Sequence, residues 1–189
     1  MRRAIRLVIF GRQGAGKGTQ CSRLAEHYHV PHISTGDILR AAVDEGTGFG
    51  LKAKAYMDAG ELLPDDVISG VVDERLRKDD TRQGFLLDGF PRTVAQAEAL
   101  IDMVGEDGVD LAIDIDVPIR VVTQRMRLRG RDDDTDEAIR VRLETYEVET
   151  RPVLDFFDDL EKLVVVDGDG TEEEVFERIV DSIGRHAPA

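Results

Sequence analysis

The stretch VIFGRQGAGKGTQ, residues 8–20, decides the fold, because an apolar run there breaks into glycines and then a lysine. Glycines at positions 11, 14, 16 and 18 let the backbone curl so that several N–H groups face one anion. A helix beginning near Lys17 adds the positive end of its dipole, and Lys17 adds a mobile cation. The stretch therefore predicts a buried strand, a phosphate-binding loop and a helix, in that order.

The residue after Lys17 departs from the usual phosphate-loop pattern, in which Ser or Thr follows the lysine and binds magnesium. Here Gly18 follows Lys17, and the hydroxyl comes one residue later, at Thr19. A second candidate for the metal is Asp88, which ends the apolar run GFLLD where a Walker-B acid would stand. The alternative for Asp88 is an ordinary aspartate at the end of a strand.

Composition limits the classes of protein that the chain can belong to. A length of 189 residues suits one domain, and 41% hydrophobic residues suffice for a core. The formal net charge of −14 argues against general binding to nucleic acid or to an anionic membrane. The single cysteine excludes an intrachain disulfide and favours a reducing compartment, so we expect a cytoplasmic protein.

The pattern of apolar runs indicates the fold class. Helical spacing separates five short apolar runs, at 4–10, 32–34, 84–88, 111–117 and 162–167. This alternation predicts an α/β, P-loop NTPase-like three-layer fold, with a five-stranded parallel sheet and helices on both faces. Helix starts are expected at Thr93, at Thr135 and at Thr171, where Glu174 completes a capping box. Residues 35–80 show three helical stretches without a strand, which indicates a helical insertion.

Arginines mark candidate anion sites. Arg40 ends STGDILR (34–40) and Arg92 lies in DGFPRTVAQ (88–96), each beside a turn. Residues 120–142 hold seven arginines against five acids, although the chain as a whole is strongly acidic. Because the guanidinium fork suits phosphate, this bias favours an anion site over a solvated helix flank. The aspartates at 132–134 are expected to hold those arginines when no substrate does.

Five motifs together resemble a known family. GAGKGTQ, ISTGDILR, GFLLDGFPRT with Gln96, RGRDDD and RLETYE have the order and spacing found in adenylate kinases, over nearly the whole chain. The resemblance implies a nucleoside monophosphate-binding arm at 34–63 and a lid at 128–134, within one domain spanning 1–189. RGRDDDTDE looks like the short form of the lid, and a single cysteine leaves no structural zinc site of the kind that longer lids carry.

The resemblance also implies site residues. ATP would be held by Gly14, Ala15, Gly16, Lys17, Gly18, Thr19, Arg125, Arg129 and Gly170. AMP would be held by Thr35, Arg40, Glu61, Leu62, Leu63, Gly89, Phe90, Pro91, Arg92, Gln96, Arg131 and Arg142. Catalysis would fall to Lys17, Arg92, Arg131 and Arg142. Asp88 would act on Mg²⁺ through water, which explains why a direct hydroxyl ligand is dispensable.

The implied activity is reversible transfer of the terminal phosphoryl group of ATP to AMP, giving two ADP, by a monomer. A pyrimidine (UMP/CMP) monophosphate kinase is the first alternative, but that group typically has Ala and Asn where this chain has Thr35 and Gln96. A non-catalytic nucleotide-binding regulator is the second alternative, and the four catalytic cations argue against it. A GTPase would need an N-K-x-D motif, which the sequence lacks.

One pair of residues departs from the family pattern, and the histidines and the cysteine are interpreted as lying outside the site. Arg12 and Gln13 stand where the family usually has two prolines, so we expect a less rigid loop with an added cation near its mouth. His27, His29 and His32 are interpreted as surface residues rather than a metal site, and Cys21 as a small buried residue.

Overall fold

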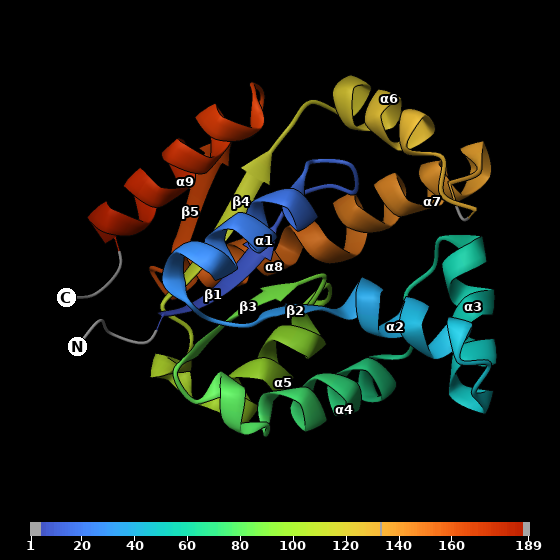
Figure 1. The fold of residues 1–189 in the computed structure, drawn as a ribbon, viewed down its shortest axis with the longest axis horizontal. Helices are drawn as coiled ribbons and strands as arrows, with labels where there is room; N and C mark the ends of the chain where they lie inside the picture. The colour runs from blue at the N-terminus through green and yellow to red at the C-terminus, as the bar shows by residue number, and fades with distance from the viewer. Residues whose placement is uncertain (1–4, 133, 187–189) are drawn as a thin grey trace.

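The computed structural model describes residues 5–132 and 134–186, and its strands form a five-stranded parallel sheet (Figure 1). The strands are β1 (Ile5–Phe10), β2 (His32–Ser34), β3 (Gly84–Asp88), β4 (Leu111–Asp116) and β5 (Leu163–Asp167). Their order is β2-β3-β1-β4-β5, so the strand that leads into the glycine loop is central. The register pairs Ile9 of β1 with Asp88 of β3, which brings Asp88 beside that loop. The predicted sheet is confirmed.

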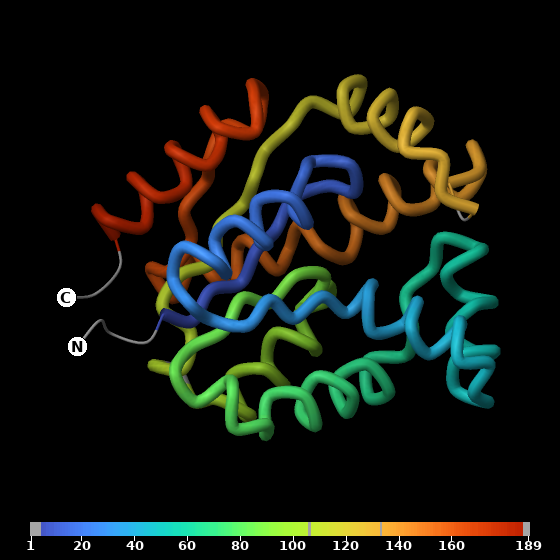
Figure 2. Tube along the Cα trace, viewed as in Figure 1, coloured from blue at the N-terminus to red at the C-terminus, as the bar shows by residue number. Residues whose placement is uncertain are grey.

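Helices cover both faces of the sheet, as the tube in Figure 2 shows. One face carries α1 (Lys17–Tyr28) and α9 (Glu172–His186), which pack on Leu7 and Ile9. The other carries α4 (Asp65–Leu76), α5 (Val94–Val104) and α8 (Arg151–Asp159), which pack on Val8 and Phe10. Alternate residues of β1 thus point to opposite faces and bury two apolar clusters. The predicted three layers are confirmed.

The remaining longer helices lie toward the carboxyl end of the sheet. They are α2 (Thr35–Asp44), α3 (Gly48–Ala59), α6 (Ile119–Arg129) and α7 (Asp136–Thr145), with the π-helical turn η3 (Tyr146–Thr150). The short 3₁₀ turns η1 (Asp79–Thr81) and η2 (Glu106–Gly108) directly precede β3 and β4, at the amino end. The region between β2 and β3 therefore contains helices and no strand, as predicted. Among the helices of the described residues, none has both the length and the apolar character needed to cross a bilayer.

Side chains cap the helices where the sequence places them. The hydroxyl of Thr93 accepts the N–H of Gln96, and that of Thr135 accepts the N–H of Ala138. At the start of α9, the Thr171 N–H donates to the Glu174 carboxylate at 2.8 Å, while the Glu174 N–H donates to the Thr171 hydroxyl at 3.3 Å. The predicted caps are confirmed, because capping depends on residues only three positions apart.

Candidate functional site

A cleft of about 420 Å³ opens at the carboxyl ends of β1 and β3, where ligands of open parallel sheets bind. The glycine loop, the start of α2, the end of α3, the end of β3 and the α6–α7 region all contribute to its walls. The predicted residues that line it are Gly14, Gly16, Lys17, Gly18, Thr19, Thr35, Arg40, Glu61, Leu62, Leu63, Asp88, Gly89, Arg92, Gln96, Arg125, Arg129, Arg131 and Arg142. The cleft thus brings together most residues of the predicted site.

The glycine loop has the shape expected of an anion cradle. Gly14 has φ 85°, and a Cβ there would lie 2.7 Å from the carbonyl oxygen of Val122, so only glycine fits without strain. Gly16 precedes the first turn of α1, whose N-terminus faces the cleft through Gly18 and Thr19. The free N–H groups and the dipole at that helix end favour a bound anion.

Lys17 is held over the loop by neutral acceptors. Its Nζ donates to the carbonyl oxygens of Gly11 at 2.7 Å and Arg12 at 3.1 Å. Burial lowers the pKa of Lys17, and the negative charge of Asp88 opposes that shift. The amine is therefore held inside the cleft, against the loop, rather than extended into solvent.

Asp88 fits the role of a carboxylate that anchors the waters of a magnesium ion. Burial alone would raise its pKa, but contact with His32 and the charges of Lys17 and Arg92 outweigh burial and lower that pKa. The group is consequently ionised at neutral pH, and it lines the cleft next to the phosphate loop. A carboxylate in this position suits a hard cation that keeps most of its water.

A hydrogen-bond network fixes the wall predicted for AMP. The Arg92 Nε donates to the Gly89 carbonyl at 2.9 Å, and the Thr35 hydroxyl donates to the same carbonyl at 2.9 Å. Gln96 accepts the Arg92 N–H through Oε1 at 2.7 Å and donates from Nε2 to Asp65 at 2.7 Å. Because Oε1 accepts and Nε2 donates, the orientation of the Gln96 amide is set by its neighbours.

Asp134 holds the arginines on the opposite wall. Its carboxylate accepts from Arg129 at 2.8 and 2.7 Å and from Arg142 at 2.8 Å, and its side chain is 1% exposed. Burial opposes ionisation, yet the two arginines outweigh it and lower the pKa of Asp134. The expectation that aspartates hold these arginines is confirmed for Asp134, whereas Asp133 lies outside the described residues. Arg125 instead approaches the Ala15 carbonyl, at 3.4 Å.

Four predicted residues do not line the cleft. Ala15 and Phe90 are buried, and Phe90 belongs to the apolar cluster beneath the sheet. Pro91 lines a small adjoining cavity. Gly170, at φ 143°, lies against Glu174 and Arg178 at the start of α9.

Arg12 points away from the cleft, although the sequence suggested a cation at its mouth. Its guanidinium contacts Glu147 at 2.7 Å and Asp116 at 3.0 Å, and its centre lies 5.4 Å from the centre of the Tyr146 ring. The Tyr146 hydroxyl in turn donates to Asp114 at 3.1 Å. The expectation of an extra cation at the cleft was therefore wrong, because two carboxylates and an aromatic ring compete for the guanidinium. These contacts anchor the loop at Arg12.

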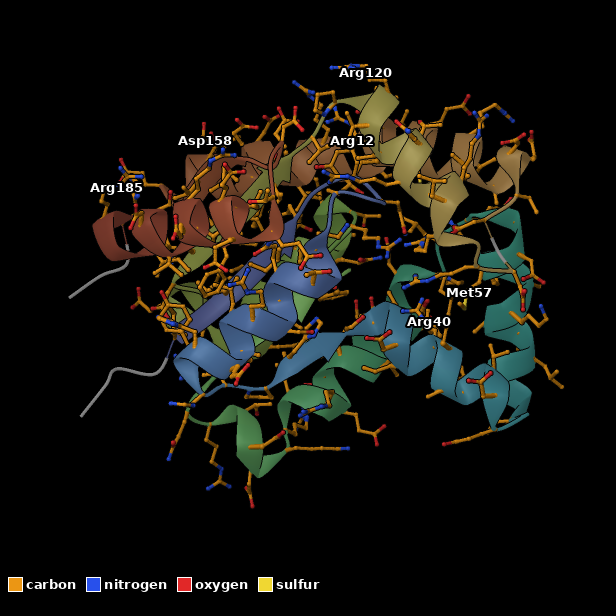
Figure 3. All side chains as sticks on the ribbon, turned by 45° about the horizontal axis from the view of Figure 1, so that its top comes forward. Arg12, Arg40, Met57, Arg120, Asp158 and Arg185 are labelled. Carbon is orange, nitrogen blue, oxygen red and sulfur yellow. The ribbon has the colours of Figure 1, made fainter. Side chains whose placement is uncertain are left out.

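Several lining residues were not predicted. They are Gln13, Ser34, Gly36, Asp37, Leu39, Met57, Gly60 and Ile68. Ser34 and Asp37 belong to a motif already recognised: Ser34 accepts the Asp37 N–H as the cap of α2, and the Asp37 carboxylate pairs with Arg40. Arg40 and Met57 are both labelled in Figure 3, on the helical insertion. The apolar members carry no signal in the sequence that separates them from core residues.

Comparison with known proteins identifies the family. The family model described as "Adenylate kinase" matches residues 9–162. Adenylate kinase 1 of Nostoc sp. is 47% identical over 182 residues, covering 95% of this chain and 98% of the relative. The adenylate kinase of Corynebacterium aurimucosum is 46% identical, with 96% and 100% covered, and that of Thermodesulfovibrio yellowstonii is 45% identical, with 93% and 97% covered. The chain belongs to the adenylate kinase family.

Proposed function

We propose that this chain transfers the terminal phosphoryl group of ATP to AMP, reversibly and with magnesium, to give two ADP. The observation that carries the proposal is that four cations from separate elements, Lys17, Arg92, Arg131 and Arg142, line one cleft. Two phosphorylated nucleotides bring together many negative charges, which only such a cluster can neutralise. Family membership supports the same activity.

ATP is assigned to the glycine-loop side of the cleft. Residues 14–19 offer backbone N–H groups, the N-terminus of α1 and the Lys17 amine to its phosphates. Arg125 and Arg129 lie on the same side, from α6. Ala15 and Gly170, whose positions lie off the cleft wall, are left with backbone roles only.

AMP is assigned to the wall formed by Thr35, Arg40, residues 61–63, Gly89, Arg92 and Gln96. Gln96 explains the choice of base. With one bond each to Arg92 and Asp65, its amide keeps one acceptor site on Oε1 and one N–H on Nε2. Adenine presents the complementary pair, an amino donor beside a ring acceptor, whereas uracil presents the reverse. Phe90 and Pro91 support this wall without lining it.

The chemistry needs charge neutralisation more than proton transfer. A phosphate oxygen of AMP attacks the terminal phosphorus of ATP, the bond from that phosphorus to the bridging oxygen breaks, and ADP leaves. The attacking oxygen is already ionised at neutral pH, so no general base is required. Arg131 and Arg142 are placed to meet the charge that spreads over the transferring group. Bound Mg²⁺ would neutralise phosphate charge, and Asp88 would hold its waters.

Two segments are proposed to close over the nucleotides, an arm at residues 34–63 and a lid at 128–134. The arm already touches the lid side, because Arg142 donates to the Met57 carbonyl at 3.1 Å. Gly60 and Gly130 have φ values of 75° and 64° and offer hinges at the end of the arm and within the lid. Closure would exclude water and so prevent hydrolysis of ATP. We expect a monomer, since one chain supplies the cleft.

A coupled assay of ADP formation tests the function. The purified chain is given ATP and Mg²⁺ with AMP, UMP, CMP or GMP in turn. We expect AMP to have the highest kcat/KM and UMP and GMP to be poor, because their edges oppose the Gln96 amide. Faster phosphorylation of UMP or CMP than of AMP would identify a pyrimidine kinase, and no turnover with any acceptor would identify a regulator.

A further inference from the structure

Three side chains that could act as metal ligands meet just behind the cleft. A thiol sulfur of Cys21, a ring nitrogen of His32 and a carboxylate oxygen of Asp88 all lie within 4.8 Å of one another. They come from α1, β2 and β3, so packed secondary structure rather than a loop fixes their positions. Over residues 5–132 and 134–186, this is the one group of three such side chains found close enough to share an ion.

The His32 ring lies against the Asp88 carboxylate. Its Nε2 atom is buried and has no hydrogen-bond partner, although it lies 3.4 Å from the Asp88 carboxylate. A buried ring nitrogen that faces a carboxylate is satisfied either by a proton or by a metal ion between the two atoms. Zinc bonds of about 2.0 to 2.3 Å in tetrahedral geometry place ligand atoms roughly 3.3 to 3.7 Å apart. The observed 3.4 Å separation therefore suits a shared metal.

The donor set selects the class of metal. A thiolate, an imidazole and a carboxylate suit zinc and similar thiophilic cations, whereas magnesium prefers oxygen ligands alone. Burial and the charge of Asp88 raise the pKa of the Cys21 thiol, so binding would release its proton. Asp88 lines the cleft, which leaves a fourth coordination position open to water or phosphate on that side.

The surrounding charges set the strength of the site. Lys17 lies one helical turn before Cys21, but the hydrogen bonds of its amine go to the Gly11 and Arg12 carbonyls rather than to the Asp88 carboxylate. Lys17 and Arg92 still act on Asp88 through their charge. This repulsion makes the affinity lower than that of a structural zinc site, as suits reversible binding.

We propose that Cys21, His32 and Asp88 form a binding site for a thiophilic divalent cation of the zinc class, and that occupation of this site inhibits phosphoryl transfer. Inhibition follows because a metal held by Asp88 takes that carboxylate away from the waters of magnesium and adds positive charge beside Lys17. The inhibitory part rests on the proposed function, whereas binding of the metal does not.

Cobalt binding tests the site directly. Because the chain has one cysteine, a thiolate-to-cobalt charge-transfer band in the near ultraviolet reports Cys21 alone. We expect one Co²⁺ per chain to give this band and Zn²⁺ to abolish it by displacement. His32→Gln should weaken Co²⁺ binding at least tenfold. The matched control, His29→Asn, alters an exposed histidine at φ 58°, a backbone conformation that asparagine tolerates, and should leave binding unchanged. Absence of the band, or equal affinity in His32→Gln, would overturn the site.

Zinc inhibition is measured in the full chain as ADP formation with excess Mg²⁺ and with free Zn²⁺ set by a metal buffer. Cys21→Ser should keep its basal turnover and require at least tenfold more Zn²⁺ for half-inhibition. Zinc that acts by binding ATP would inhibit both proteins equally, so a difference between them reports the site. Equal inhibition of both proteins would refute the inhibitory part. A chain that gives the cobalt band but forms no ADP with any acceptor would refute the proposed function and leave the metal site standing.

Discussion

Replacing Arg12 with alanine removes the contacts that tie the phosphate loop to the end of β4 and to the turn η3. The guanidinium makes N···O contacts with Glu147 at 2.9 and 2.7 Å and with Asp116 at 3.0 Å. It also lies 5.4 Å from the centre of the Tyr146 ring. The Arg12 side chain is 13% exposed, so these contacts are partly shielded from solvent. We expect Arg12→Ala to lower stability more than loss of an ordinary surface arginine does.

The expected loss of stability in Arg12→Ala is the sum of the contributions of the separate contacts. A forked pair with a partly buried carboxylate such as Glu147 contributes about 1 kcal/mol, and the more exposed Asp116 contributes roughly 0.3 kcal/mol. The contact with the Tyr146 ring adds about 0.5 to 1 kcal/mol. Because the groups share one guanidinium, the sum of about 2 kcal/mol is approximate. For a chain of 189 residues, it corresponds to a fall in Tm of roughly 4 to 8 °C.

Thermal unfolding followed by circular dichroism at low and high salt measures this effect. The control is Arg77→Ala, which removes an arginine that is 76% exposed and paired with Asp73, and which should not shift Tm measurably. High salt should narrow the difference in Tm between wild type and Arg12→Ala, since salt screens ion pairs. An unchanged Tm together with a tenfold rise in KM for ATP would refute the anchoring role and indicate that Arg12 contacts phosphate.

Three further predictions concern the cleft. Arg131→Lys should lower kcat at least ~100-fold, about 2.7 kcal/mol, because lysine lacks the planar guanidinium fork. The control, Arg127→Lys, lies outside the cleft and should keep its kcat. Near-normal kcat in Arg131→Lys would mean that Arg131 is part of a solvated lid face. Asp65→Ala should free the Gln96 amide to flip, raising KM for AMP several-fold and reducing discrimination against UMP, and unchanged selectivity in the acceptor series would contradict that role. Because arginines lower the pKa of Asp134, its pairs stabilise the fold above the unfolded value of about 3.9 and are lost as pH falls further. The stability gap between wild type and Asp134→Asn, from urea unfolding, should therefore narrow below about pH 4, and a gap independent of pH would exclude the ion pairs as its cause.

Local signals made the fold predictable from the sequence. Strand positions follow from runs of apolar residues, and the capping pair Thr171 and Glu174 follows from residues three positions apart. The arrangement of glycines before Lys17 specified the loop because each tight turn needs its own glycine. Such features depend on neighbouring residues and on no distant partner, so a sequence displays them directly.

Contacts between distant segments were less predictable. Gln96 was expected at the AMP wall, but its partner Asp65 lies 31 residues away and gave no signal. Arg12 was expected to place a cation near the mouth of the cleft, and nothing in the sequence indicated its partner Glu147, which is 135 residues away. Nor does the sequence indicate that the fold brings Cys21 and His32 close to Asp88. The aspartates after Arg131 were expected to hold arginines, but the sequence does not indicate that Asp134 pairs with both Arg129 and Arg142.

The cations of the cleft are held by two kinds of acceptor, and the difference bears on how a nucleotide engages them. Asp134 holds Arg129 and Arg142 with charge-assisted bonds, whereas neutral carbonyls hold Lys17. The bonds to Asp134 join opposite charges, whereas the acceptors of Lys17 carry no charge, so a phosphate displaces the acceptors of Lys17 at lower cost than it displaces Asp134. We therefore expect the fixed loop and Lys17 to bind the ATP phosphates first, and the release of both arginines from Asp134 to need both substrates, because Arg129 is assigned to ATP and Arg142 to AMP. That order ties full assembly of the cationic cluster to the presence of both substrates.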